Sequence, residues 1–162
     1  MGGMVCIDSH VMIWAIKEEA SPGQEFMIPK AKALLRWLDK TDVKVIVPSV
    51  VVAEFLMRIP PEIHTTINNM IQRNFICPPF DLQAAAHFSR IWQARKDQKV
   101  LQDLIEKGKT RQELKADSMI VATALARGAN LIYSHDEGLK KFAEGYIRVS
   151  EIPDIPEQKQ LF

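Results

Sequence analysis

Short apolar segments that stop at a polar residue or a proline recur along this chain, and helix-forming segments separate them. The expected strands are Val5–Ile7, Val43–Val47, Phe75–Cys77 and Asn130–Tyr133, with Tyr146–Val149 as a candidate fifth. Short, almost wholly apolar strands are typical of a parallel sheet, because helices bury both of its faces. The alternation with helices therefore predicts an α/β fold with a central parallel sheet.

The segments between the strands carry helix signals. Helices are expected over His10–Lys17, from Pro29 to Lys40, from Ser49 as N-cap, after Pro60-Pro61 to Asn69 or Arg73, over Leu82–Lys96 behind the cap Asp81, and over Lys115–Arg127. Gly128 suits the position just after the last of these, where a left-handed backbone is common. The stretch from Gln98 to Leu114 is polar and mixed, and Gly108 is expected to break it.

Length and composition fit one globular domain. The chain has 162 residues, a net charge of +1 and two cysteines, Cys6 and Cys77. Such a length can bury a core, whereas two cysteines are too few for a disulfide scaffold or a cysteine-based zinc site. No apolar run approaches the ~20 residues of a membrane span, and the N-terminus lacks the pattern of a signal peptide. A cytoplasmic location is therefore expected.

Two carboxylates follow strands closely. Asp8 comes directly after the first strand, and Asp136 comes shortly after Tyr133, behind Ser134 and His135. In open α/β sheets, ligand sites form at the carboxyl ends of the strands. Sequence order alone thus predicts that Asp8 and Asp136 lie at one edge of the sheet.

Two further carboxylates share the apolar stripe of a helix. Glu54 lies three residues after Val51 in one helix. Asp117 lies three residues before Ile120 in another. Residues at this spacing share one helix face. Both acids are therefore expected to point inward rather than into solvent.

A group of inward-facing carboxylates needs a compensating cation. Burial of each charge is costly, like charges raise one another's pKa, and no Lys or Arg lies in the strand ends beside these acids. A divalent ion removes the difficulty, and oxygen-only ligands suit Mg²⁺ or Mn²⁺. Taken singly, Asp8 and Asp136 can also be read as loop or cap residues. Asp117 can be read as an acid that stabilises a helix N-terminus.

The segments around these acids resemble the PIN-domain family. The matching segments are CIDSHVMIWAI around Asp8, VPSVVVAEFL around Glu54, KADSMIVATALARGANLIYSHDEGLKKF around Asp117 and Asp136, and the closing YIRV. They run from Val5 to Val149, and their layout is similar to that of the VapC-type toxins of toxin–antitoxin pairs. Two features depart from that layout: the chain is longer, and no aromatic residue follows Gly138.

The resemblance implies a Rossmann-like three-layer α/β/α sandwich with a central parallel sheet of four to five strands over residues 1–150. The tail over 151–162 is polar and holds two prolines, so it is expected to be extended or loosely ordered. The resemblance also implies a Mg²⁺- or Mn²⁺-dependent endoribonuclease whose metal ligands and catalytic residues are Asp8, Glu54, Asp117 and Asp136. Ser9 and Ser134 would orient carboxylates or a metal-bound water, unless they are N-cap or turn serines. The partners implied are RNA, a small antitoxin protein and a second copy of the chain.

The reaction expected is metal-assisted hydrolysis of RNA phosphodiester bonds. One ion, held chiefly by Asp8 and Asp117, would lower the pKa of a water towards ~7, and a second ion near Asp136 would steady the leaving oxygen. In-line attack would leave a 5′-phosphate and a 3′-hydroxyl. No general-base histidine is needed, so His10 and His135 are interpreted as solvent-facing turn residues.

Positive charge gathers between Arg90 and Lys115. This span holds eight basic and four acidic residues, a local excess of four positive charges. Such a stretch suits a phosphate-binding rim, with Lys115, Arg111 and Lys109 as candidate substrate contacts. A solvated helical face has the same composition and is the alternative interpretation.

Other functions compete with the nuclease hypothesis. A nucleic-acid-binding or scaffold module of the same fold would leave the acids unused for catalysis, and the presence of all four counts against it. A HAD-like phosphatase with Asp8 as nucleophile would usually need an acid two residues later, where this chain has His10. A dinucleotide-binding fold would need Gly-x-Gly-x-x-Gly after the first strand, and the sequence lacks it.

Overall fold

A parallel sheet forms the centre of residues 3–155, the part of the chain that the computed structural model describes. Its strands are β1 (Met4–Ile7), β2 (Lys44–Ile46), β3 (Leu131–Tyr133) and β4 (Arg148–Ser150), in the order β2-β1-β3-β4. The chain moves outward from β1 to β2 and then returns to the other side of β1 to form β3 and β4. The reversal creates a switch point between β1 and β3, and ligand sites of open α/β sheets form at such a point.

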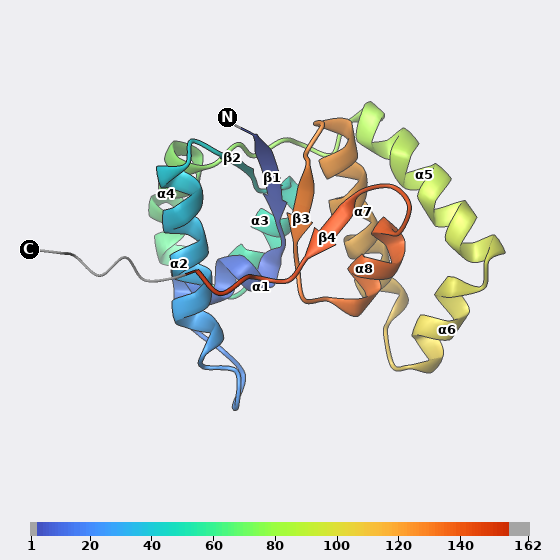
Figure 1. Ribbon diagram of the computed structural model, residues 1–162, viewed down its shortest axis with the longest axis horizontal. Coiled ribbons are helices and arrows are strands. Elements are labelled where there is room, and N and C mark those ends of the chain that lie inside the picture. The colour runs from blue at the N-terminus through green and yellow to red at the C-terminus, as the bar shows by residue number, and fades with distance from the viewer. Residues whose placement is uncertain (1–2, 156–162) are drawn as a thin grey trace, which may run out of the picture.

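Helices cover both faces of the sheet (Figure 1). They are α1 (Ser9–Met12) with the π-helical turn η1 (Ile13–Lys17), α2 (Met27–Lys40), α3 (Ser49–Leu56), the 3-10 turn η2 (Pro61–Ile63), α4 (His64–Asn74), α5 (Leu82–Asp97), α6 (Val100–Glu106), α7 (Arg111–Ala126) and α8 (Glu137–Ala143). In Figure 1, α2 and α4 lie on one flank of the strands, and α5, α7 and α8 lie on the other. The predicted three-layer α/β/α fold is confirmed. Among these helices, none has the length and apolar character needed to cross a membrane.

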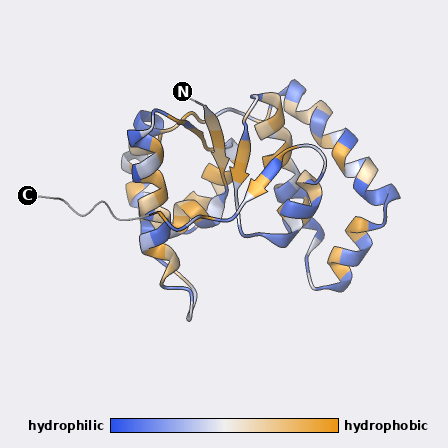
Figure 2. Cartoon of the chain, in the orientation of Figure 1, coloured by the Kyte–Doolittle hydropathy of each residue, from blue (hydrophilic) through white to orange (hydrophobic). Residues whose placement is uncertain are grey.

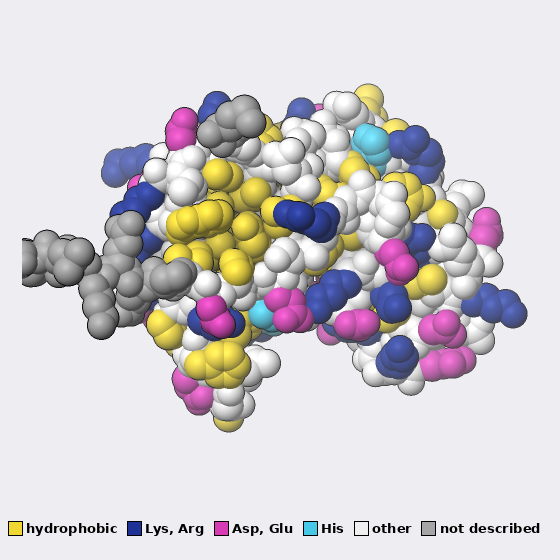
Figure 3. Space-filling model, viewed as in Figure 1, with side chains coloured by type: hydrophobic (Ala, Val, Ile, Leu, Met, Phe, Trp, Pro, Cys, Tyr) yellow, Lys and Arg dark blue, Asp and Glu magenta, His cyan; other side chains and the backbone are white. Residues whose placement is uncertain are grey.

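The core lies between the sheet and its helices. The strands are almost continuously hydrophobic (Figure 2), and Cys6, Ile7, Ile46 and Ile132 are 0% exposed. Each such aliphatic side chain contributes about 1.5–3 kcal/mol through removal of apolar surface from water. In the view of Figure 3, hydrophobic side chains also gather on the surface between α2 and β4. Because the strands are buried in this core, the residues at their carboxyl ends have fixed positions.

The predicted third strand, Phe75–Cys77, is wrong. Only Ile76 pairs with the sheet there, as an isolated parallel bridge to Ile46 beside β2. The Ile76 N–H donates to the Val45 carbonyl at 2.9 Å, and the Val47 N–H donates to the Ile76 carbonyl at 2.8 Å. Two prolines follow at positions 78 and 79, and a proline has no N–H to extend the ladder. The candidate fifth strand is present one to two residues later than expected, as β4.

Several predicted helix starts are displaced. Pro48, not Ser49, occupies the cap position of α3, and Ser49 is the first helical residue. The last long helix begins at Arg111 rather than Lys115, because Thr110 and Glu113 form a capping box around its first turn. The predicted helix over His10–Lys17 is divided into α1 and η1, and the helix assigned to Pro29 begins two residues earlier. The tail is irregular from Glu151 to Ile155, and its remaining residues, 156–162, lie outside the described part.

Candidate active site

Asp8 and Ser134 meet at the switch point of the sheet. The last residues of β1 and β3, Ile7 and Tyr133, are paired, so the residues after them leave the sheet at the same edge. Asp8 is 3% exposed, and its Oδ1 accepts a hydrogen bond from the Val11 N–H at 3.3 Å. Its Oδ2 accepts a hydrogen bond from the Ser134 hydroxyl. Asp8 is therefore the N-cap of α1, which is one of the two predictions made from the sequence. It is also a buried acid that is hydrogen-bonded to Ser134, the residue after β3.

Glu54 reaches the same edge from α3, which packs against α1 and α7. The Ser9 hydroxyl donates a hydrogen bond to Oε1 of Glu54 at 2.9 Å. Ser9 itself is buried in the first turn of α1, directly after Asp8. Each of the two serines singled out in the sequence thus contacts one of the four carboxylates.

Asp117 comes from α7, and its carboxyl group lies next to that of Asp136. It lies in the second turn of α7 and is 8% exposed, and its buried Oδ2 has no hydrogen-bond partner among residues 3–155. The stabilising effect of a helix N-terminus falls off within the first turn, so that alternative does not explain its position. Burial of a polar atom without a partner is unfavourable. Some other group, a proton or a cation, must therefore compensate this oxygen.

Asp136 is tied down by three contacts at the start of α8. Its Oδ1 accepts from the Leu139 N–H at 3.0 Å, and its own N–H donates to the Ser134 hydroxyl at 3.0 Å. The Lys109 ammonium, from the link between α6 and α7, donates to Oδ2 of Asp136 at 2.8 Å. One of the basic residues predicted to contact substrate therefore pairs with a predicted metal ligand.

The four acids line one open cavity of about 490 Å³. Its wall includes Asp8, Ser9, His10, Glu54, Met57, Arg58, Lys109, Asp117 and Asp136. Two of the candidate substrate contacts, Arg111 and Lys115, are not among the residues that line it. Sequence reasoning did not identify Arg58, which lies in the turn just after α3 and so outside the helix pattern that pointed to Glu54. The cavity wall therefore includes two cations, Arg58 from the turn after α3 and Lys109, which pairs with Asp136.

The acids influence one another's protonation. Burial, followed by the charge of Asp136, raises the pKa of Asp117 to about 9. Burial also raises the pKa values of Asp8 and Glu54, although hydrogen bonds from Ser134 and Ser9 oppose this. Burial acts in the same direction on Asp136, but the Lys109 ammonium and the Leu139 N–H outweigh it and hold that pKa below its usual range. Three of the four carboxylates therefore lack sufficient positive charge nearby.

The donor set has the chemistry of a site for a hard divalent cation. All four acids offer oxygen atoms, which Mg²⁺ and Mn²⁺ prefer. The uncompensated Oδ2 of Asp117 and the raised pKa values agree with this. Within residues 3–155, however, no three acidic, histidine or cysteine side chains lie close enough together to form a ready-made ligand cluster. A metal ion would have to draw the carboxylates inward.

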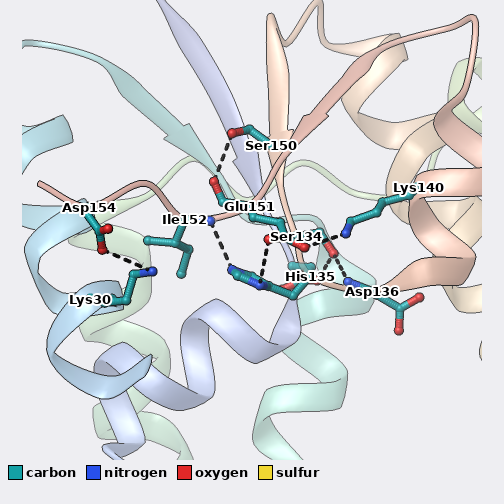
Figure 4. Close-up of polar contacts among 10 residues, drawn as sticks. Lys30, Ser134, His135, Asp136, Lys140, Ser150, Glu151, Ile152 and Asp154 are labelled. Atoms are coloured by element: carbon teal, nitrogen blue, oxygen red, sulfur yellow. Dashed lines mark hydrogen bonds and ion pairs between the residues drawn. The ribbon is translucent and has the colours of Figure 1, made fainter. Parts of the chain in front are cut away.

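The interpretation of His135 as a solvent-facing turn residue is wrong. Its Nε2 accepts a hydrogen bond from the Ile152 N–H at 3.0 Å (Figure 4), and its ring packs edge-on against Trp14. The His10 ring also packs against Trp14, with ring centroids 5.6 Å apart. His135 therefore connects the turn after β3 to the segment after β4 through this hydrogen bond. His10 is exposed and lines the cavity.

Comparison with known proteins gives one family and one fold. The sequence profile of the PIN domain matches residues 5–145. No curated protein matches the sequence significantly. Structural similarity extends over nearly the whole chain at low sequence identity, and therefore concerns the fold.

VapBC structures from three bacteria are among the similar solved structures. A chain of VapBC2 from Rickettsia felis, bound to a DNA fragment from its promoter, has a TM-score of 0.63 and 12% identity, covering 91% of this chain and 98% of that one. For DNA-bound VapBC from Salmonella typhimurium the TM-score is 0.65 and the identity 14%, covering 93% and 99%. For VapBC-1 from nontypeable Haemophilus influenzae they are 0.62 and 11%, covering 91% and 97%.

Proposed function

The chain belongs to the PIN-domain family, a family of nucleases, and we propose that it is a Mg²⁺- or Mn²⁺-dependent endoribonuclease that acts as the toxin of a toxin–antitoxin pair. One observation carries the catalytic part: carboxylates from four separate segments line a single cavity, and one of them, Asp117, has a buried oxygen without a partner. A buried acid in this condition is unfavourable unless a cation joins it.

Asp8 and Asp117 are the proposed principal ligands, because they are the most buried of the four acids. Ser134 holds Asp8, and Ser9 holds Glu54, so two of the carboxylates keep a fixed orientation without a metal. When bound, a divalent ion supplies Lewis-acid chemistry that activates water for attack on phosphorus. Asp136, fixed at the start of α8, completes the acidic wall.

The substrate part of the proposal rests on the two cations in the cavity wall. Lys109 and Arg58 lie on different elements and line the same hollow as the acids. Ammonium and guanidinium groups bind phosphate oxygens and position a nucleic-acid backbone. An RNA strand that crosses the cavity would thus be held on both sides of the scissile phosphate. Lys115 and Arg111 remain candidates for contacts further along the strand.

The toxin assignment rests on the likeness to VapBC chains and on the resemblance of the motifs to VapC-type toxins. It implies a small antitoxin protein as partner, a homodimer, and action in the cytoplasm. Co-expression with the product of a neighbouring small reading frame tests the partner: a stable complex in which cleavage is suppressed is the expected result. Mass measurement of the free protein tests the homodimer.

Cleavage assays test the catalytic proposal directly. The protein is incubated with single-stranded and structured RNA in Mn²⁺ or in EDTA, beside Asp8→Asn, Asp117→Asn and, as a matched control, Asp39→Asn on the exposed side of α2. We expect cleavage in Mn²⁺ only, retained by the control and lost by the other two variants. Metal-independent cleavage, or full activity in both site variants, would contradict the proposal. Binding of RNA without any cleavage would instead favour a scaffold or binding module.

A further inference from the structure

A second hollow, of about 380 Å³, is lined by residues of α5, α6 and the start of α7 and by none of the four acids. Its lining combines three basic residues, Lys96, Lys99 and Arg111, with the apolar side chains of Trp92, Leu101 and Ile105. Glu106 also lines it and is its one acid among the described lining residues. The stretch from Gln98 to Leu114, which is polar and mixed in sequence, supplies most of the residues that line it.

The three cations are available to a ligand. Lys96, Lys99 and Arg111 are exposed, and none of them forms an ion pair with any residue between positions 3 and 155. Lys99 also has a left-handed backbone, with φ of 61°, just before α6. A lysine is unfavourable in that conformation, where glycine or asparagine would relieve strain. Position 99 therefore has a lysine that lines the hollow, although its left-handed backbone conformation disfavours that residue.

The floor of the hollow is apolar and stiff. Leu101 is 7% exposed, whereas Ile105 is 43% exposed and presents its side chain to solvent. Trp92 stacks against both Phe88 and Phe142, with ring centroids 5.8 and 5.9 Å away. These stacked contacts hold the Trp92 ring in place where it lines the hollow. A flat ring inserted here would meet apolar atoms while its charged substituents met the three cations.

The hollow adjoins the acidic cavity through one short stretch of backbone. Lys109 lines the cavity and Arg111 lines the hollow, two residues further along the chain. Their Cα atoms are at most ~7 Å apart, given the reach of ~3.3–3.6 Å per residue. The left-handed Gly108 (φ 101°) and the capping box at Thr110 fix this turn on either side of Lys109. Only this turn separates the wall of the cavity from the wall of the hollow, so a linear polyanion needs to cross just a few residues to contact both.

We propose that this hollow, defined by Trp92, Lys96, Lys99, Leu101, Ile105 and Arg111, binds a nucleotide of single-stranded RNA that flanks the scissile bond. The inference rests on the proposed ribonuclease function and extends it to a substrate class. Phosphates pair with the three cations, and the base lies on the apolar floor, the two elements that single-strand binding sites combine. An acidic peptide could use the cations, but the continuity with the acidic cavity favours the nucleic acid.

Binding is measured in the Asp8→Asn background, so that cleavage does not enter. The test variant carries Lys96→Gln, Lys99→Gln and Arg111→Gln. The matched control carries Lys40→Gln, Lys44→Gln and Arg73→Gln, three exposed residues with the same total change in charge. The probes are a labelled single-stranded RNA, a dinucleotide, single-stranded DNA and an acidic peptide.

We expect the test variant to bind the long RNA about tenfold more weakly or worse, with the slope of log K against log salt reduced by about 2. The dinucleotide should bind as before, and the control should bind all probes as before. A further variant, Ile105→Ser, should weaken RNA binding without changing the salt slope. Equal losses in test and control, or a loss confined to the acidic peptide, would overturn the proposal.

Failure of this inference differs from failure of the proposed function. If the parent protein cleaves RNA while the test variant binds the long RNA normally, the catalytic proposal stands and the hollow is not its substrate site. If no RNA is cleaved but the test variant still loses RNA binding, the hollow is an RNA site on a protein without catalysis.

Discussion

A Cβ atom at Gly138 would lie 2.6 Å from the Oδ2 atom of Asp117. The first turn of α8 therefore approaches α7 so closely that only a glycine leaves room for the Asp117 carboxylate. The same added carbon would lie 3.2 Å from Oδ1 of Asp136. Gly138 thus controls the space shared by two of the four acids.

Gly138→Ala should separate stability from metal binding. Alanine is favoured over glycine in a helix by about 0.5–1 kcal/mol, which offsets part of the crowding. The carboxylate of Asp117 must nevertheless shift, so we expect the Mn²⁺ affinity, measured by titration calorimetry, to fall by about tenfold or more. Glu137→Ala, its exposed neighbour, is the control and should bind normally. Unchanged Mn²⁺ affinity in Gly138→Ala would show that the acids tolerate this displacement.

The stability of the metal-free protein should fall as pH rises. The pKa of Asp117 is raised from 3.8 to about 9, and those of Asp8 and Glu54 are raised as well. Between the unfolded and folded pKa values the folded state binds more protons, so its stability is greatest below pH ~4 and is lost up to pH ~9. Asp136, with a lowered pKa, acts oppositely and only below its usual range. Other groups add their own slopes, so the comparison is made between variants.

Thermal unfolding measured between pH 5 and 9 checks this linkage. The upper end of this pH range is set by the raised pKa of Asp117. Asp117→Asn should flatten the decline relative to the parent, because the group that retains its proton is gone. Added Mn²⁺ should raise the Tm more at the alkaline end than at the acidic end, since the metal competes with protons for the same oxygens. A Tm profile that is parallel in parent and variant would contradict the raised pKa.

Much of the site was predictable because strand ends and helix faces are local properties of the sequence. Asp8 follows an apolar segment, and Glu54 and Asp117 share helix faces with buried residues, so their direction followed from spacing. Lys109 was named as a candidate substrate contact, but its pairing with Asp136 depends on the turn at Gly108, which brings together residues 27 positions apart. Gly138 gave no such signal, because its role arises only when α8 meets α7.

The wrong predictions for the fold have a common cause, which is that contacts with distant residues override the local sequence pattern. Phe75–Cys77 has the composition of a strand, yet two prolines behind it and the edge position beside β2 leave only one bridge. His135 follows a strand in a turn, which usually means exposure, but the Ile152 N–H and the Trp14 ring cover it. Both contacts join residues that are far apart in the chain, so neither was visible in local patterns.

Lys109→Met should change metal and RNA binding in opposite directions. The ammonium pairs with Oδ2 of Asp136, an oxygen that a metal ion would also use, so its removal should tighten Mn²⁺ binding several-fold. The same change removes a charged donor for phosphate, so the KM for RNA should rise by about tenfold or more. The control is Lys107→Met, an exposed lysine that does not line the cavity. Weaker Mn²⁺ binding would mean that Lys109 positions Asp136 rather than competing for it.

Ser134→Ala should weaken the site through Asp8 and Asp136 together. Ser134 is 0% exposed, and its hydroxyl donates to Oδ2 of Asp8 and accepts from the Asp136 N–H, so its loss leaves that buried oxygen and that N–H without this partner. We expect a cost of about 1–3 kcal/mol in unfolding free energy and a loss of about 10–100-fold in Mn²⁺ affinity. Ser118, also 0% exposed but without a hydrogen-bond partner within residues 3–155, provides the matched control. If Ser134→Ala and Ser118→Ala changed the unfolding free energy and the Mn²⁺ affinity equally, Ser134 would contribute only packing to the site.

Arg95 caps the far end of the helix that carries Asp136. Its guanidinium is 7% exposed and donates to the Phe142 carbonyl at 3.1 Å and to the Glu144 carbonyl, at the end of α8. Arg95→Met keeps the apolar stem but leaves both carbonyls unpaired, so we expect a loss of about 2–3 kcal/mol and a Tm lower by about 4–12 °C. Gln98→Ala, which removes only the exposed partner of Arg95 Nη1, should cost under about 1 kcal/mol.

At temperatures where Arg95→Met is folded, its Mn²⁺ affinity should stay near that of the parent, because Asp136 keeps its contacts with Leu139 and Lys109. A large loss of metal binding with little change in Tm would instead make Arg95 a positioning residue for the acidic cavity.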